Sequence, residues 1–241
     1  MGFEAKMNKV LILSGAGLSA ESGIRTFRDS NGLWEEYDIM EVCSAQGFAK
    51  DRQKVLNFYD QRRADISEKK PNEAHLMITD LKKKHPGNIH VLTQNVDDLL
   101  EKSGCPDVIH LHGTLRDLRC ENCGNIWDIG YGSIKGKTCP KCGTSNTRHN
   151  VVMFHEPAPA YELLYETISK CATGLFIAIG TSGQVIDAGG IADYSKLSIL
   201  NNGDPEPMMD KAFTKVFHEN ATTAAPKIAE LVEEFITSGY F

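Results

Sequence analysis

The sequence lacks several features that would assign a protein to a membrane, to secretion or to nucleic acid. It has no run of about 18 apolar residues, so no segment is predicted to span a membrane. Its first residues, MGFEAKMNKV, do not place basic residues before an apolar stretch, and we expect a cytoplasmic protein without a secretory signal. Positive charge is in deficit, with 26 Lys and Arg against 32 Asp and Glu and a net charge of -6. Because nucleic-acid-binding domains usually present a basic face, we expect neither nucleic acid nor a membrane as a partner.

The cysteines do not have the pattern of a disulfide-bonded scaffold. The chain has seven of them, an odd number, which favours a reducing compartment. Internal repeats, low-complexity tracts and an evident linker are also missing. With 241 residues, 41% of them hydrophobic and 24% charged, the composition is typical of a globular protein. The length suits one α/β domain, with room for a small appended module.

Short apolar segments that end in glycine or polar residues alternate with helical patterns along the chain. This alternation predicts a mostly parallel sheet that helices cover on both faces. Ligands of such sheets bind at the carboxyl ends of the strands, so the segments GAG, TQN, HG and GTS are expected to converge on one cleft. Strands are expected within 9–17, 88–95, 107–113, 174–182 and 196–201, and helices at 51–68, 72–84, 96–102, 160–170 and 226–238, with Asn72 and Asp97 as starts of two of these helices.

A glycine-rich turn follows the first predicted strand. Gly15-Ala16-Gly17-Leu18-Ser19-Ala20 matches the G-x-G-x-x-G/A pattern, in which backbone N–H groups approach a dinucleotide pyrophosphate. Taken alone, the same residues are equally well explained as a structural tight turn. The loop that follows, SGIRTFRDSNGLW, has the composition of a cover over a bound ligand and offers Arg28 to a phosphate.

Two Cys-x-x-Cys pairs predict a structural zinc ion. Cys120 and Cys123 are separated from Cys139 and Cys142 by fifteen residues, which is zinc-ribbon spacing. Four thiolates complete a tetrahedral shell and leave no open position for catalysis. The zinc ion therefore does not need His112, which closes the predicted strand VIHLHG. A lone histidine beside glycine is more often structural, but convergence with the glycine turn and TQNVD favours proton transfer.

One arginine interrupts the apolar face of a predicted helix. Val55, Tyr59, Arg62 and Ile66 follow one another at helical spacing. One interpretation is that Arg62 pairs with a neighbouring carboxylate. The other is that Tyr59 and Arg62 together receive a substrate carboxylate.

These motifs together resemble those of the sirtuins, NAD-dependent protein-lysine deacylases, from about Lys9 to the C-terminal helix. The resemblance rests on GAGLSAESGIRTFR, TQNVDDLL, HLHG, the cysteine pairs, VVMFHE and GTSG, in the family's order. The segment GIRTFRDSNGLWEE and the Tyr59-x-x-Arg62 pair look like the class III branch, which removes succinyl and malonyl groups. Within the resemblance, the functional interpretation of Arg62 is favoured.

The resemblance implies one catalytic domain over residues 1–241, with an α/β fold. A Rossmann-like NAD-binding part would comprise about 1–32, 72–112 and 151–241. A small subdomain would comprise a helical insertion at about 33–71 and the zinc ribbon at 113–150.

The resemblance also implies a reaction. Nicotinamide would leave the ribose of NAD as the acyl oxygen attacks, and His112 would act as general base while the acyl group passes to ADP-ribose. The products would be nicotinamide, deacylated lysine and O-acyl-ADP-ribose. An alternative enzyme is a sirtuin-like ADP-ribosyltransferase, and a non-enzymatic alternative is a zinc-ribbon interaction module.

Site residues are assigned from the same resemblance. The acyl-lysine channel would be lined by Tyr59, Arg62, Val151 and Phe154. NAD would be held by Gly15, Ala16, Gly17, Ser19, Ile24, Arg25, Thr26, Phe27, Arg28, Trp34, Gln94, Asn95, Val96, Asp97, Gly180, Thr181, Ser182, Asn201 and Ala221.

Three positions depart from the family's pattern. His155 stands where the family usually has glycine, and its side chain is expected to crowd or contact the substrate backbone. Leu100 replaces a family histidine, for which we expect packing consequences only. Cys43 stands where the acyl-binding branch often has alanine, and it is small enough to admit a longer acyl group.

Overall fold

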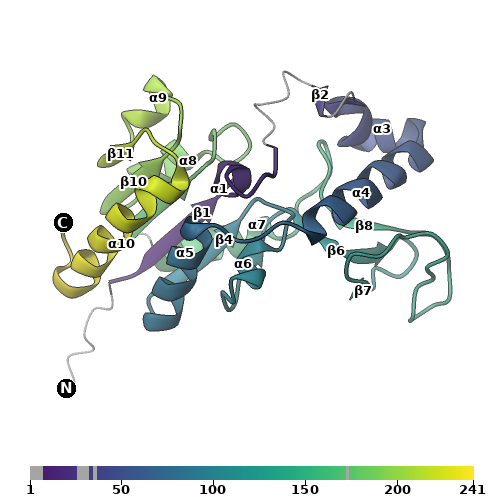
Figure 1. Ribbon diagram of the computed structural model, residues 1–241, viewed down its shortest axis with the longest axis horizontal. Coiled ribbons are helices and arrows are strands. Elements are labelled where there is room, and N and C mark those ends of the chain that lie inside the picture. The colour runs from purple at the N-terminus through teal and green to yellow at the C-terminus, as the bar shows by residue number, and fades with distance from the viewer. Residues whose placement is uncertain (1–7, 26–32, 35–36, 172–173) are drawn as a thin grey trace.

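A computed structural model describes residues 8–25, 33–34, 37–171 and 174–241. Its centre is a parallel sheet in the order β11-β10-β9-β1-β4-β5, as Figure 1 shows in part. The order places β1 in the middle with chain crossovers on both sides, which confirms the predicted Rossmann-like class. The strands are β1 (Val10–Ser14), β4 (Ile89–Thr93), β5 (Ile109–His110), β9 (Leu175–Ile179), β10 (Leu197–Asn201) and β11 (Lys215–Phe217).

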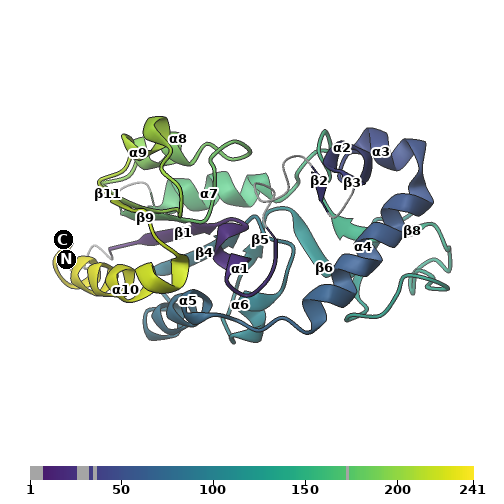
Figure 2. The same cartoon turned by 45° about the horizontal axis from the view of Figure 1, so that its top comes forward.

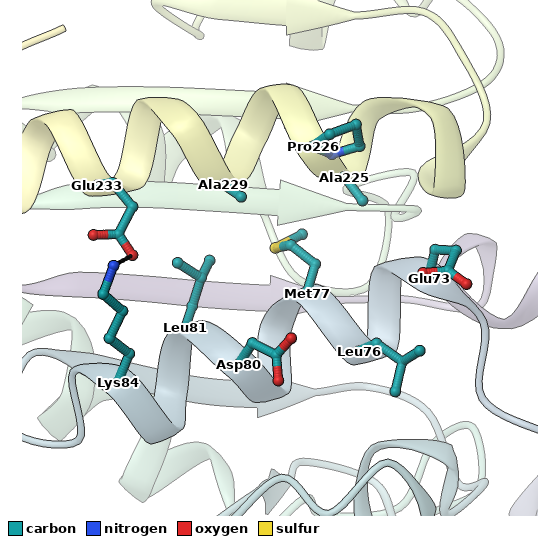
Figure 3. A pocket seen from close by; sticks show the side chains of 10 residues that line it. All are labelled: Glu73, Leu76, Met77, Asp80, Leu81, Lys84, Ala225, Pro226, Ala229 and Glu233. Atoms are coloured by element: carbon teal, nitrogen blue, oxygen red, sulfur yellow. Dashed lines mark hydrogen bonds and ion pairs between the residues drawn. The ribbon is translucent and has the colours of Figure 1, made fainter.

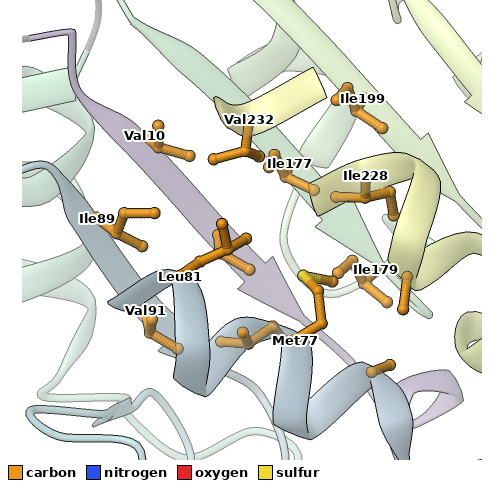
Figure 4. Close-up of a cluster of buried hydrophobic side chains, with 14 of the residues drawn as sticks. Val10, Met77, Leu81, Ile89, Val91, Ile177, Ile179, Ile199, Ile228 and Val232 are labelled. Atoms are coloured by element: carbon orange, nitrogen blue, oxygen red, sulfur yellow. The ribbon is translucent and has the colours of Figure 1, made fainter. Parts of the chain in front are cut away.

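Helices cover both faces of this sheet, as expected for strands that are apolar on both sides (Figures 1 and 2). On one face Val10, Ile177 and Ile228 belong to a core cluster that joins the sheet to α5 and α10 (Figure 4). On the other face Leu11 and Phe176 belong to a second cluster. The first face is covered by α5 (Glu73–Lys84), α6 (Leu99–Lys102) and α10 (Ala221–Ser238), and the second by α7 (Tyr161–Cys171), α8 (Ala188–Asp193) and α9 (Pro207–Asp210).

The remaining elements form a group with a hydrophobic cluster of its own. Val55, Phe58, Leu115 and Val151 belong to this cluster, which packs a helix against an antiparallel ribbon. Figure 2 shows the group on the side of the molecule away from α8, α9 and α10. Its elements are β2 (Leu33–Trp34), β3 (Tyr37–Asp38), α2 (Ile39–Val42), α3 (Ala45–Lys50), α4 (Arg52–Ser67) and the ribbon strands β6 (Gly113–Cys120), β7 (Ile126–Asp128) and β8 (Thr147–Val151). A short helix, α1 (Gly17–Ala20), follows β1, and its Leu18 belongs to the core cluster on the first face of the sheet.

A buried arginine joins α4 to the ribbon. Arg63 is fully buried, and its guanidinium donates to the carbonyls of Leu115, Gly132 at 3.1 Å and Asp117 at 3.1 Å. Its Nη1 also lies 3.7 Å from an oxygen of Asp60. A buried charge requires this degree of pairing, so Arg63 holds α4 on the strand that follows His112. The sequence interpretation considered Arg62 and missed its neighbour.

One of the predicted helix starts agrees with the structure and two do not. Asn72 caps α5 with a complete capping box, as expected. The helix predicted from Val96 begins only at Leu99, with Asp98 at its N-cap, so Asp97 is not its start residue. The last helix begins at Ala221, five residues before the predicted start, and the carboxylate of Glu21 accepts the N–H of Thr222 in its first turn at 2.9 Å. Leu100 packs in the core, as predicted.

No helix in the described part of the chain is both long and apolar enough to cross a membrane.

Candidate active site and zinc centre

The carboxyl ends of the central strands meet, as the sequence predicted. The N–H of Gly17 donates to the carbonyl of Gly180 at 2.9 Å, which joins the turn after β1 to the end of β9. The Gly180 N–H in turn donates to Asn201 at the end of β10. On the other side of β1, the Gln94 amide donates to the Thr181 hydroxyl at 2.9 Å. Segments far apart in sequence are therefore held together at one edge of the sheet.

The glycines at this edge have a packing role of their own. A Cβ on Gly17 would lie 2.5 Å from the Cα of Gly180, and a Cβ on Gly15 would lie 2.7 Å from the Gly180 oxygen. Side chains are therefore excluded at these positions even without a ligand. The same bare backbone is the kind of surface that a pyrophosphate requires, so the structural and the dinucleotide-binding interpretations are compatible.

The buried Ser19 hydroxyl, beside the glycine turn, contacts three polar side chains. Its hydroxyl donates to Asp97 at 3.0 Å and accepts from the Asn95 amide at 3.1 Å. His75 Nε2 lies 3.3 Å from the same hydroxyl, and burial lowers the pKa of His75 to about 4, so the imidazole is neutral. Burial also raises the pKa of Asp97. These hydrogen bonds orient the side chains of Asn95 and Asp97, two of the residues predicted to hold NAD.

His112 is held in the tautomer that a general base needs. Its Nδ1 lies 3.0 Å from the carbonyl of Gln94, which can only accept, so Nδ1 carries the proton. Nε2 then has a free lone pair, and the Tyr161 hydroxyl, 2.9 Å away, donates to it. Burial lowers the pKa of His112, which keeps the imidazole neutral near pH 7. The predicted role in proton transfer agrees with this geometry.

The strand assignment for His112 was wrong by two residues. β5 ends at His110, and His112 lies in the turn before β6. The turn depends on Gly113, which has a φ of +78° and a backbone that passes close to Asn150. A Cβ there would lie 2.0 Å from the Asn150 oxygen, so glycine is required for the chain to leave the sheet and enter the ribbon.

His110 supports the same loop from the other side. Its Nδ1 lies 2.9 Å from the Asn95 carbonyl and its Nε2 lies 2.8 Å from a carboxylate oxygen of Glu101. Burial acts to lower the pKa of His110, but the hydrogen bond and charge of Glu101 outweigh it, and the net shift is upward. The two histidines of HLH therefore bond consecutive carbonyls, those of Asn95 and Gln94.

This pairing predicts a stability difference that depends on pH. A histidine whose folded-state pKa is raised stabilises the fold below its unfolded pKa and loses that contribution as pH rises through the folded value. We expect His110→Gln to lower the free energy of unfolding by about 1 kcal/mol at pH 6 and by less at pH 9. Urea unfolding of both proteins at the two pH values measures this. An equal difference at pH 6 and pH 9 would contradict the ion pair.

The residues predicted to line the acyl channel are neighbours. The N–H of Val152 donates to the His112 carbonyl at 2.9 Å, which places β8 beside the histidine. Two residues on, the Phe154 N–H donates to the Cys43 carbonyl at 2.8 Å, and the Phe154 side chain is 38% exposed. Cys43 and Tyr59 share a side-chain hydrogen bond. A chain of hydrogen bonds therefore links His112 to Tyr59 through the segment after β8 and Cys43.

Arg62 lies close enough to Cys43 for its charge to act on the Cys43 thiol. Burial raises the pKa of the Cys43 thiol to about 12, the Tyr59 bond opposes this rise, and so does the charge of Arg62. Burial also raises the pKa of Tyr59, which keeps the phenol protonated as a donor. The Arg62 guanidinium lies 5.7 Å from the ring centre of Phe58. Tyr59 is buried and Arg62 half-buried on the predicted helical face.

His155 occupies a backbone conformation that favours glycine. Its φ is +66°, which costs a side-chain-bearing residue energy and explains why a glycine would suit the position. Its Nδ1 lies 2.8 Å from Gln46 Oε1, so the exposed imidazole is directed toward α3. The next residue, Glu156, pairs with the buried Arg148. The loop is therefore held in place on both sides of His155.

Four cysteine sulfurs form a cluster that fits one structural zinc ion. All four lie within 4.8 Å of one another, with 3.6 Å between Cys120 and Cys142 and 3.7 Å between Cys123 and Cys139. Zn–S bonds of about 2.3 Å in a tetrahedron place sulfurs roughly 3.8 Å apart, which agrees with these distances. The four thiolates would complete the coordination shell without His112.

Loss of one ligand is expected to cost both metal and stability. Cys142→Ser should abolish stoichiometric zinc and lower Tm by at least about 6 °C, since metal binding is coupled to folding of the ribbon. Cys171→Ala, a buried cysteine on α7, is the matched control and should keep its zinc. Elemental analysis and thermal unfolding measure the two effects. Wild-type protein purified without chelator but free of zinc would refute the assignment.

The other residues predicted to hold NAD differ in their surroundings, and some lie outside the described residues. Thr26, Phe27 and Arg28 lie outside the described residues. Ile24 packs partly against the small cluster and Arg25 is exposed, while Trp34 belongs to β2. Asn201 is buried and its amide donates to the carbonyls of Phe217 and Glu219, so its side chain braces β11. The remaining members, Ala16, Val96, Ser182 and Ala221, lie in or next to the loops at the carboxyl edge or at the start of α10.

A pocket between α5 and α10 lies apart from this site (Figure 3). Met77 and Ala229 contribute apolar surface, and Lys84 pairs with Glu233 at 2.8 Å. None of the predicted site residues lines it.

Comparisons with known proteins agree with these observations. A sequence model of the Sir2 family matches residues 15–187. The NAD-dependent protein deacylase of Campylobacter jejuni is 52% identical over 233 residues, covering 97% of this chain and 99% of that protein. The NAD-dependent protein deacylase of Helicobacter hepaticus is 38% identical over 255 residues, covering 96% and 100%.

Solved structures give the same result. A Sir2 homologue in complex with NAD superposes with a TM-score of 0.81 at 33% identity, covering 96% of this chain and 92% of that one. A Sir2 protein with an inhibitor, 2′-O-acetyl-ADP-ribose and a deacetylated p53 peptide superposes with a TM-score of 0.74 at 25% identity, covering 96% of each chain.

Proposed function

This chain belongs to the Sir2 family, and from that premise we propose that it removes negatively charged acyl groups as well as acetyl groups from protein lysines. The protein is an NAD-dependent protein deacylase. The observation that supports the wider acyl range is that Tyr59 and Arg62 both act on Cys43, which the segment after β8 links to His112. Our proposal concerns which residues carry the activity and which acyl groups they accept.

NAD would lie along the carboxyl edge of the sheet. The bare backbone at Gly15, Gly17 and Gly180 supports a pyrophosphate site there. Gln94 and Asn95 lie between this turn and His112, where the ribose and nicotinamide would be placed. When bound, NAD supplies a ribose whose nicotinamide leaves and whose hydroxyls then accept the acyl group.

His112 would remove a proton from the ribose. Its Nδ1 donates to Gln94 throughout, so Nε2 is the nitrogen that accepts the proton. The resulting imidazolium would be stabilised by the same Gln94 carbonyl, whose hydrogen bond opposes the downward pKa shift caused by burial. The geometry therefore supports a base that is neutral before reaction and is assisted once it is charged.

The acyl group would extend from His112 toward α4. Val151 and Phe154 would line the lysine channel, and Cys43 leaves more room than a larger side chain would at its inner end. A succinyl or malonyl carboxylate would there meet the phenol O–H of Tyr59 and the guanidinium of Arg62. Arginine can donate two parallel N–H bonds to a carboxylate, whereas an acetyl methyl group offers no acceptor.

The expected partners are NAD and acylated lysines in other proteins. The net charge of -6 supports the proposal that neither nucleic acid nor an anionic membrane surface is a partner.

The decisive experiment compares three matched peptides. Acetyl-, succinyl- and malonyl-lysine versions of one sequence are incubated with the protein and NAD, and the products are identified by mass spectrometry. We expect deacylated peptide from all three, together with nicotinamide and O-acyl-ADP-ribose. Deacylation of the acetyl peptide alone would contradict the proposed acyl range. Labelled ADP-ribose on protein without any deacylated peptide would instead indicate an ADP-ribosyltransferase.

A further inference from the structure

Both ring nitrogens of His112 are hydrogen-bonded within the protein. Nδ1 donates to Gln94, and Nε2 accepts from the hydroxyl of Tyr161 at 2.9 Å. The two rings lie 5.8 Å apart between centroids with planes at 44°, so the contact is a directed hydrogen bond and not a stacked pair. Nε2 is also the atom that must take the proton, so Tyr161 contacts the reactive position of the base.

The start of α7 fixes the position of Tyr161 next to His112. Tyr161 is the first residue of α7, and its N–H closes a turn on Ala158 at 3.0 Å. One turn further on, Leu164 is buried in the core beneath the sheet and anchors the helix. The phenol is thereby directed from α7 toward the loop that carries His112.

The ionisable groups around His112 are engaged elsewhere. His110 on β5 bonds Asn95 and Glu101 of α6, and Asp97 of the preceding loop accepts from Ser19 and from the N–H of Leu99. Tyr165, one turn along α7, is 66% exposed. Among the residues that the structure describes, Tyr161 makes the one side-chain hydrogen bond to His112.

We propose that Tyr161 is a positioning residue for the base: its phenol directs Nε2 of His112 toward the sheet edge and keeps that nitrogen unprotonated. A donor on the lone pair favours the neutral imidazole, because protonation of Nε2 breaks the bond that the phenol makes. The ribose hydroxyl would replace the phenol as the donor when substrate binds. This inference rests on the proposed function of His112.

Removal of one oxygen tests the proposal. Tyr161→Phe keeps the ring and removes the donor, so the acid limb of the pH profile of kcat/KM for NAD should move to higher pH. The expected displacement is about half to one pH unit, from the usual net strength of one hydrogen bond. The KM for the acyl peptide should stay within about twofold. NMR titration of the His112 imidazole without ligands should show the same displacement.

Two further variants separate positioning from folding. Tyr165→Phe is the matched control on the same helix, and it should leave the acid limb unchanged. A 3-fluorotyrosine at position 161 has a more acidic phenol and donates more strongly, so it should move the acid limb to lower pH without a change of shape.

The outcomes distinguish the inference from the proposed function. An unchanged acid limb and an unchanged His112 titration in Tyr161→Phe overturn the positioning role, whatever happens to Tm. Substantial deacylation by His112→Ala would instead overturn the base assignment itself. A shift in Tyr161→Phe with none in Tyr165→Phe supports the role of this one hydroxyl.

Discussion

Replacement of His112 by alanine should lower kcat for deacylation by about 10²–10⁴-fold while leaving the fold and NAD binding largely intact. The size of the effect follows from the loss of a positioned general base. The imidazole is neutral, its Nδ1 donates to Gln94, and its Nε2, which accepts from the Tyr161 hydroxyl, is the nitrogen that can take a proton. Single-turnover deacylation of an acetyl-lysine peptide measures the loss directly, and titration with NAD measures binding separately.

The control for this experiment is another histidine outside the site. His85 at the end of α5 bonds Glu233, so His85→Ala should retain wild-type activity. If His112→Ala keeps activity within about threefold of wild type, another group removes the proton and the assignment fails. A parallel loss of NAD binding would show that the side chain acts through the shape of the site.

The sequence predicted those parts of the fold that local pattern determines. The strands β1, β4, β9 and β10 are five-residue segments in the middle of a sheet covered on both faces, and most of their residues are apolar. Their carboxyl ends were expected to meet, and hydrogen bonds between them confirm it. The zinc ribbon was equally clear, because four cysteines at this spacing have few other uses.

The parts that were missed depend on contacts between distant residues. β11 has three residues and forms by pairing with β10, so its sequence carries little periodicity. The first turn of α10 is hydrogen-bonded by Glu21, 201 positions earlier in the chain. Neither feature leaves a mark in a local window of sequence.

Adjacent residues on a helix were also difficult to distinguish. Arg62 and Arg63 differ by one step of about 100° around α4, and helical periodicity cannot say which of them meets the ribbon. The structure assigns that structural role to Arg63, whose guanidinium bonds three carbonyls. Arg62 is thereby left on the face that includes Tyr59, which supports its functional interpretation. The sequence predicts Tyr161 only as part of a helix, because the residues around it do not predict a contact with His112.

The acyl preference predicts a loss that depends on the substrate. We expect Arg62→Met to lower kcat/KM for a succinyl-lysine peptide by at least about thirtyfold, and for the acetyl peptide by less than about threefold. Removing one partner of a poorly solvated charge pair commonly costs about 2–5 kcal/mol, and each 1.4 kcal/mol is roughly tenfold. An acetyl group has no carboxylate, so it loses nothing when the guanidinium is removed. Methionine preserves most of the length and apolar surface of the side chain.

Both peptides are measured on one preparation, so that any damage to NAD binding or folding affects them equally. Arg52→Met is the matched control, because Arg52 lies on the same helix and bonds Glu121 of the ribbon at 2.9 Å. It should change the two substrates alike and by little. Cys142→Ser should likewise change kcat/KM for the two peptides in equal proportion, since the ribbon is expected to act on stability alone. Equal proportional losses for succinyl and acetyl peptides in Arg62→Met would make Arg62 a structural residue, and the carboxylate of the acyl group would then be recognised elsewhere or not at all.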